Sequence, residues 1–135
     1  MRRHRFVLGA LGGALLLLSS CKDEIANPSV NPIVFPQANV SFAQHVEPLF
    51  QQRCALVGCH AGGNPAAGLD LSTPAYNKLM NHQPRLVVSG EGNNSLLSQR
   101  IDGRFPPQMP LNRDPLNANQ ISGIKKWIDE GALNN

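Results

Sequence analysis

The sequence of 135 residues predicts an all-α domain with three to five short helices joined by long loops. Apolar residues recur at helical spacing in separate segments, and capping residues precede most of these segments. Stretches rich in proline and glycine lie between them. The longest run typical of a strand is Leu86-Val87-Val88, which is too short to predict a sheet.

The first 20 residues are typical of an export signal. Met1-Arg-Arg-His-Arg5 is basic, and the apolar run from Phe6 to Leu18 is too short to span a bilayer comfortably. Leu18-Ser-Ser-Cys21 resembles a bacterial lipobox, in which the cysteine is lipidated and becomes the new N-terminus. We therefore expect a lipoprotein signal peptide over 1–20. Lipid on Cys21 would anchor the chain in the cell envelope, at the periplasmic face or the outer-membrane surface. An ordinary signal peptide with a chance cysteine is the alternative.

Removal of this signal changes the charge balance. The full chain has 12 basic and 9 acidic residues, and loss of Arg2, Arg3 and Arg5 leaves nine of each. The basic excess therefore belongs to the signal and gives no support to a nucleic-acid partner. Residues 21–40 contain several prolines and asparagines without sustained periodicity, which predicts a lipidated N-terminus followed by a flexible tether. The alternative is a segment that packs along the domain through Ile33, Val34 and Phe35.

The folded domain is expected to span 41–135. Its first helix begins with a capping box at Ser41 and Gln44, and Pro48 either kinks this helix or lies in the first turn of a second one. Three more helices are predicted: from Thr73-Pro74 to about Met80, from a cap at Asn94 or Ser95 to about Ile101, and from a capping box at Asn117 and Gln120 to Gly131. Gly103 to Pro115 is expected to be an irregular loop.

The segment Cys54-Ala-Leu-Val-Gly-Cys59-His60 has the composition of a c-type haem attachment site. The two thiols would form thioethers with the porphyrin vinyl groups, and His60 would be the proximal ligand of the iron. Four residues separate the cysteines where two are usual. The extra residues must bulge outward, and Gly58 would allow a positive φ at the bulge.

Two other interpretations of this segment remain open. The cysteines could form a disulfide, which an exported compartment permits, although this leaves His60 unexplained. They could instead hold zinc together with His60 and a distant fourth ligand such as His82.

Met109 is the main candidate for the sixth iron ligand. It lies in Pro106-Pro-Gln-Met-Pro110, a stiff segment that can hold a thioether over the iron. Met80, His82, His45 or an open site are the alternatives. A His/Met ligand pair would raise the reduction potential relative to two histidines.

An ordered set of short motifs resembles the small single-haem cytochrome c domains of exported bacterial proteins, including the planctomycete type. The set covers residues 41–133 and consists of Phe42…Val46-x-Pro-Leu-Phe50-x-x-Arg53-Cys54, Cys59-His60, Gly68-Leu-Asp-Leu71, Ser95-Leu-Leu97, Arg100-Ile101, Met109-Pro110, Gln120-Ile121 and Trp127-Ile-Asp-x-Gly-Ala132. The resemblance implies a class I-like cytochrome c fold around one covalent haem c, with Cys54 and Cys59 as anchors and His60 and Met109 as axial ligands. The wall of the core and haem pocket would then comprise Leu69, Leu71, Leu96, Leu97, Ile101, Ile121, Ile124, Trp127 and Ile128.

The function expected from this reading is that of a membrane-anchored electron carrier, not an enzyme, because no general acid, base and nucleophile converge in the sequence. Its partners would be redox proteins: a dehydrogenase, an oxidase or another cytochrome. A haem enzyme or gas sensor with an open sixth site is one alternative. A haem-free, disulfide-containing surface lipoprotein with an interaction role is the other.

Overall fold

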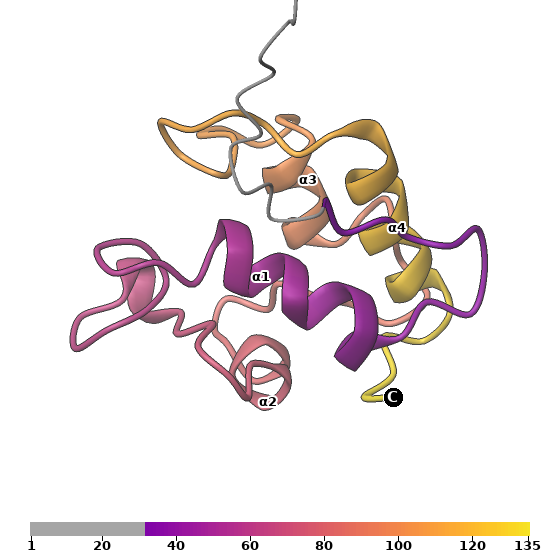
Figure 1. The fold of residues 1–135 in the computed structure, drawn as a ribbon, viewed down its shortest axis with the longest axis horizontal. Helices are drawn as coiled ribbons and strands as arrows, with labels where there is room; N and C mark the ends of the chain where they lie inside the picture. The colour runs from indigo at the N-terminus through magenta and orange to yellow at the C-terminus, as the bar shows by residue number, and fades with distance from the viewer. Residues whose placement is uncertain (1–31) are drawn as a thin grey trace, which may run out of the picture. The chain divides into compact units, whose positions relative to one another are not determined.

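A computed structural model describes residues 32–135 (Figure 1). The predicted signal at 1–20, the lipidation of Cys21 and the tether up to residue 31 lie outside these residues. The described part is helical and contains no sheet, as predicted; its only β pairing is a single bridge between Val57 and Ala61. The elements are η1 (Phe42–Val46), α1 (Glu47–Arg53), η2 (Ala66–Gly68), α2 (Tyr76–Met80), α3 (Leu96–Ile101) and α4 (Ala118–Asp129).

The first helical segment changes its geometry at the predicted proline. The Ser41 hydroxyl accepts a hydrogen bond from the Gln44 backbone N–H at 3.2 Å, so Ser41 caps the segment as predicted. The first turn is a π-helix, and Pro48 lies in the first turn of the α-helix that continues it. This confirms the second of the two roles expected for Pro48, since proline needs no hydrogen-bond acceptor at that position.

Helix α4 has both ends where the sequence places them. The Asn117 side chain accepts the Gln120 N–H at 2.9 Å, and the Gln120 side chain accepts the Asn117 N–H at 3.1 Å. Gly131 has a φ of 104° and ends the helix, because this backbone conformation is strained for other residues. One face of α4 is buried, including Ile124, Trp127 and Ile128.

The core centres on Trp127, which is fully buried. Its ring centroid lies 5.4 Å from that of Phe42 in η1 and 6.5 Å from that of Tyr76 in α2. The two polar groups of this cluster are satisfied: the Trp127 Nε1–H donates to the Leu133 carbonyl at 2.9 Å, and the Tyr76 hydroxyl donates to the Ala132 carbonyl at 2.8 Å. We call Phe42, Tyr76 and Trp127 the aromatic hub. Figure 1 shows α1 running between α2 on one side and α3 with α4 on the other.

Residues before Ser41, where the domain is predicted to begin, also pack against the described helices. Phe35 is only 2% exposed and lies against Gly123 of α4, where a Cβ atom would overlap its ring. Asn119 donates to the Phe35 carbonyl and accepts its N–H. The Glu130 carboxylate accepts the N–H of Val40 at 2.8 Å, and this bond holds its pKa below the usual range. The last residues of the predicted tether therefore pack along the domain, because Phe35 offers apolar area that a tether would leave in water.

The two short central helices depart from prediction in detail. Helix α2 begins at Tyr76 rather than at Thr73-Pro74, and the Glu47 side chain from α1 accepts the Ala75 N–H at 2.7 Å just before it. Helix α3 follows Ser95 as expected, but the Ser95 hydroxyl accepts the Val88 N–H instead of capping the helix. Seven of the nine predicted core positions are buried, while Leu96 and Ile121 are half-buried.

Candidate functional site

The segment between the two cysteines folds back on itself at the end of α1. The Cys54 carbonyl accepts the N–H of Leu56 at 2.9 Å and that of His60 at 3.2 Å, so His60 returns to Cys54 despite the long spacing. The extra residues form an exposed tip, where Val57 is 91% exposed. Gly58 has a φ of 83°, which confirms the predicted positive value.

Both cysteines are half-buried and neither forms a disulfide. Although Cys54 is partly exposed as a residue, burial of its sulfur raises the pKa of the thiol to about 12; Arg53 lowers this pKa and Cys59 raises it further. A thiol with this pKa stays protonated at neutral pH, so it is a poor ligand for a free metal ion. The disulfide considered for this pair is not formed in the structure.

The His60 ring has one nitrogen engaged and one available. Its Nδ1 lies 3.2 Å from the Leu69 carbonyl oxygen, which assigns the proton to Nδ1. The backbone of His60 is also held in place, because its carbonyl accepts the Leu71 N–H at 2.8 Å. Within residues 32–135, Nε2 makes no hydrogen bond, so its lone pair is free to bind a metal. A carbonyl oxygen at one ring nitrogen is the arrangement that orients a histidine ligand of a metal.

Met109 lies on a separate loop that α3 holds in place. Its backbone N–H donates to the Arg100 carbonyl at 2.9 Å, and its side chain packs half-buried against the core. One contact joins this loop to the cysteine segment: Arg53 Nη2 donates to the Asp114 carbonyl at 2.5 Å. The structure thus gathers Cys54, Cys59 and His60 in one segment and ties the Met109 loop to the residue just before Cys54.

Of the alternative sixth ligands, His82 is the one with hydrogen-bond partners at both ring nitrogens in the described part of the chain. His82 has a carbonyl oxygen at each ring nitrogen, that of Pro84 at 3.2 Å from Nδ1 and that of Ala67 at 3.1 Å from Nε2. His45 Nδ1 is 3.0 Å from the Ser41 backbone nitrogen, and its ring lies beside Phe35. The Met80 side chain is half-buried against the core, as that of Met109 is.

The zinc interpretation finds no support in the described part of the chain. No group of three or more His, Cys, Asp or Glu side chains is placed to hold a metal ion there. Haem iron needs no such group, since the porphyrin supplies four of its ligands and the protein only the axial ones. A pocket of about 320 Å³ is lined by residues such as Val40 and Glu130 and contains none of the predicted ligands.

Two parts of this arrangement were not predicted from the sequence. The Leu69 carbonyl carries no residue-type signal, because every residue has one. The role of Arg53 as a link to a loop 61 positions away depends on the tertiary fold. Only its position next to Cys54 could have drawn attention to it.

No protein-family model matches the chain, and neither a curated protein nor a solved structure is significantly similar to it. None of the helices within residues 32–135 is long and apolar enough to cross a membrane.

Proposed function

We propose that this protein is a monohaem c-type cytochrome with a class I-like fold, anchored to a membrane through Cys21, that carries single electrons between exported redox proteins. The observation that carries the proposal is the His60 ring. Its Nδ1 faces the Leu69 carbonyl and its Nε2 is unengaged, in a segment that also holds two unpaired thiols.

The residues fit covalent attachment of haem. Each thiol S–H adds across one vinyl C=C bond, forming a C–S and a C–H bond, so no atom leaves and no oxidant is consumed. The high pKa of Cys54 does not matter in the product, because a thioether sulfur carries no proton. The bound haem supplies the one-electron change between ferric and ferrous iron.

The rest of the chain contributes orientation and ligation. Leu69 and Leu71 are buried and fix the backbone groups that hold the His60 ring and carbonyl. Met109 offers a half-buried thioether on a loop held by Arg100. If haem is bound, the Met109 thioether together with the His60 imidazole would favour the ferrous form and a raised potential. The partners would be a dehydrogenase, an oxidase or another cytochrome.

The test is to export the full chain in a host competent for haem attachment. We expect a sharp reduced α-band, and a mass after denaturation that is higher by one haem. A colourless protein with the apo mass, from both this host and the native source, would overturn the proposal.

Variants separate the axial ligands. His60→Ala should abolish the low-spin spectrum, and Met109→Ala should convert it to that of an open or exogenously ligated sixth site. Met80→Ala is the matched control and should leave the spectrum unchanged. An unaltered spectrum in Met109→Ala would reject Met109 as the ligand and favour a haem enzyme or gas sensor only if added CO or cyanide bound to the wild type.

A further inference from the structure

The side chain of His82 joins two segments that are well separated in the chain. Its Nδ1 lies 3.2 Å from the Pro84 carbonyl oxygen, and its Nε2 lies 3.1 Å from the carbonyl oxygen of Ala67. The backbone N–H of His82 donates to the Leu79 carbonyl at 3.4 Å, so α2 holds the residue that carries this ring. A single side chain therefore connects the turn after α2 with η2.

The contact with Ala67 bears on the position of η2, which has no buried residue of its own. Ala67 has a φ of 53° and Gly68 a φ of 70°, and such a left-handed conformation is uncommon for alanine. Within residues 32–135, the bond from His82 is the one hydrogen bond that joins 61–68 to a residue outside 54–72. The exposed side of this loop thus depends on His82 for its connection to the rest of the domain.

The residue after η2 carries the carbonyl that orients His60. The Leu69 carbonyl oxygen lies 3.2 Å from His60 Nδ1, and the Leu69 N–H donates to the Ala66 carbonyl of η2 at 3.1 Å. The Leu69 side chain is buried and fixes the inner side of this backbone. Movement of η2 on the outer side would still displace the carbonyl that His60 faces.

We propose that His82 is a positioning residue: by holding the Ala67 carbonyl, it keeps the Leu69 carbonyl in line with His60 Nδ1. This inference rests on the proposed function, in which His60 is the proximal iron ligand, and assigns to His82 a role other than that of a ligand. It acts on the iron site through the backbone of η2.

The chemistry of the His82 ring makes this contact dependent on pH. A neutral imidazole has one N–H, so it donates to one of the two carbonyl oxygens and turns a lone pair toward the other. The imidazolium form has two N–H groups and donates to both. Since histidine changes its charge within about pH 5 to 8, the contact should be strongest at the acidic end of this range.

The charged groups on the joined segments do not supply such a dependence. Lys78 of α2 pairs with Asp70 at 2.8 Å, and its hydrogen bond is the main cause that lowers the pKa of the Asp70 carboxyl to about 2. Lysine and arginine, here Lys78 and Arg85, ordinarily keep their charge throughout pH 5 to 8. Among the described residues, no carboxylate oxygen lies within 4.0 Å of the ring. On the loop itself, the Cys59 thiol and the His60 ring would both be bound in the haem-loaded protein.

The experiment measures solvent exchange by NMR in the full-length, haem-loaded, reduced protein, because low-spin ferrous haem is diamagnetic. The protons followed are the His60 Nδ1–H and the Leu69 amide N–H, with the Ile124 amide of α4 as the internal reference. His82→Gln keeps one donor but has no proton to lose between pH 5 and 8. The ratio of its exchange rate to that of the wild type is taken at each pH, which cancels the intrinsic pH dependence of exchange.

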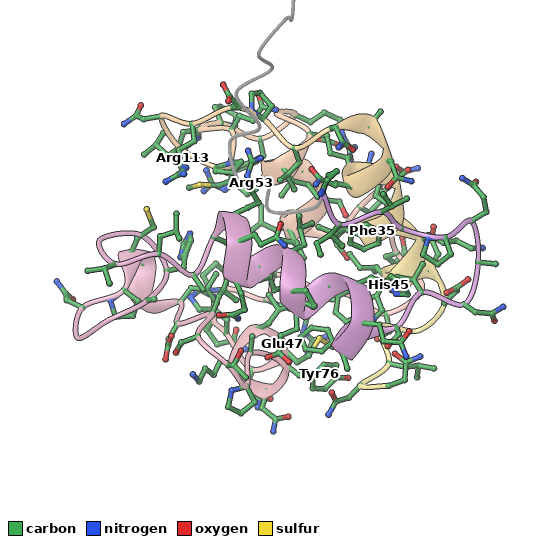
Figure 2. All side chains as sticks on the ribbon, viewed as in Figure 1. Phe35, His45, Glu47, Arg53, Tyr76 and Arg113 are labelled. Atoms are coloured by element: carbon green, nitrogen blue, oxygen red, sulfur yellow. The ribbon has the colours of Figure 1, made fainter. Side chains whose placement is uncertain are left out.

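His45→Gln is the matched control. Figure 2 shows His45 beside Phe35, at the end of the helical segment away from Arg53 and hence from the cysteine segment. Its Nδ1 lies 3.0 Å from the Ser41 backbone nitrogen, so the substitution removes a titrating ring without touching η2.

At pH 5 the ratio for His82→Gln should be about 3- to 10-fold at both loop protons, the effect expected from one hydrogen bond. It should approach one at pH 8, where the wild-type ring also has a single donor. Ratios near one are expected at Ile124 and, for His45→Gln, at every proton.

A ratio near one at pH 5, or an equal increase at Ile124, would overturn the inference. Equal ratios at the two pH values would also overturn it, because His82 would then be a structural contact without the double donation. A wild type without haem would instead refute the proposed function, and the Leu69 amide in that haem-free sample would still decide whether His82 holds the loop.

Discussion

The aromatic hub and the two loops with the predicted haem ligands are held together by different kinds of contact. In the hub, rings from η1, α2 and α4 pack together, and the Trp127 Nε1–H and the Tyr76 hydroxyl both have hydrogen-bond partners. In the loops, backbone hydrogen bonds fix the chain, while His60 Nε2 and both thiols have no partner among the described residues. The difference indicates that stability comes from the hub and that the loops present groups for a further ligand.

The largest expected effect is the loss of the hub tryptophan. Trp127→Ala removes a fully buried side chain and should lower the free energy of unfolding by about 3–5 kcal/mol. Denaturant titration of the haem-loaded protein measures this change. Val57→Ala, at the exposed tip of the cysteine segment, should change the same quantity by less than about 0.5 kcal/mol. Similar losses of unfolding free energy in the two variants would contradict the conclusion that stability comes from the hub.

A smaller effect is expected where the segment before Ser41 packs on α4. A methyl group in Gly123→Ala would overlap the Phe35 ring, so we expect a loss of about 1–3 kcal/mol. If residues 32–40 were a free tether, the same change would stabilise α4 by up to about 1 kcal/mol through helix propensity. The cost should shrink in a Phe35→Ala background, where the segment can move away.

Sequence alone predicts the structural features that depend on residues close together in the chain. The capping box at Asn117, the stop at Gly131 and the positive φ at Gly58 are local features, and all are confirmed. The packing of Phe35 on Gly123 and the contact of Arg53 with the Asp114 carbonyl join residues far apart in the chain. No local pattern encodes such contacts.

In the candidate site, too, some features follow from local sequence and others depend on the tertiary fold. The residue types in the cysteine segment predict its chemistry, whereas the orientation of the His60 ring depends on where the Leu69 carbonyl lies after folding. The prediction that α2 begins at Thr73-Pro74 is wrong for a related reason. The N–H of Ala75, just before the helix, donates to the Glu47 carboxylate of α1 rather than to a neighbouring capping residue.

Ion pairs of Asp102 connect α4 with the loop that follows α3. The Asp102 carboxylate accepts bonds from Lys125 at 2.9 Å and Arg104 at 2.8 Å. Burial opposes its charged form, but the bonds from these two residues outweigh burial and hold the pKa of Asp102 below its usual value. Asp102→Asn should cost about 1–3 kcal/mol at pH 7. Asp114 is exposed and its carboxylate forms no ion pair among residues 32–135, so Asp114→Asn is the control and should change stability little.

The smallest expected effect lies in the His60 loop itself. Asp70 stands between Leu69 and Leu71, and hydrogen bonds from Lys78, then from Ser72, lower its pKa to about 2. A lowered carboxyl pKa contributes stability above the unfolded value of about 4, and that stability is lost as the pH falls toward 2. The difference between the urea midpoints of wild type and Asp70→Asn should therefore be present at pH 5–7 and vanish near pH 2.

This difference should be small, because water and salt screen the exposed Lys78–Asp70 pair. The reduced α-band should not move, since the buried side chains of Leu69 and Leu71 hold the backbone that orients His60. A loss larger than that of Asp102→Asn, or a changed spectrum, would contradict the comparison: surface charge in the loop, rather than packing, would then set the position of the proposed iron ligand.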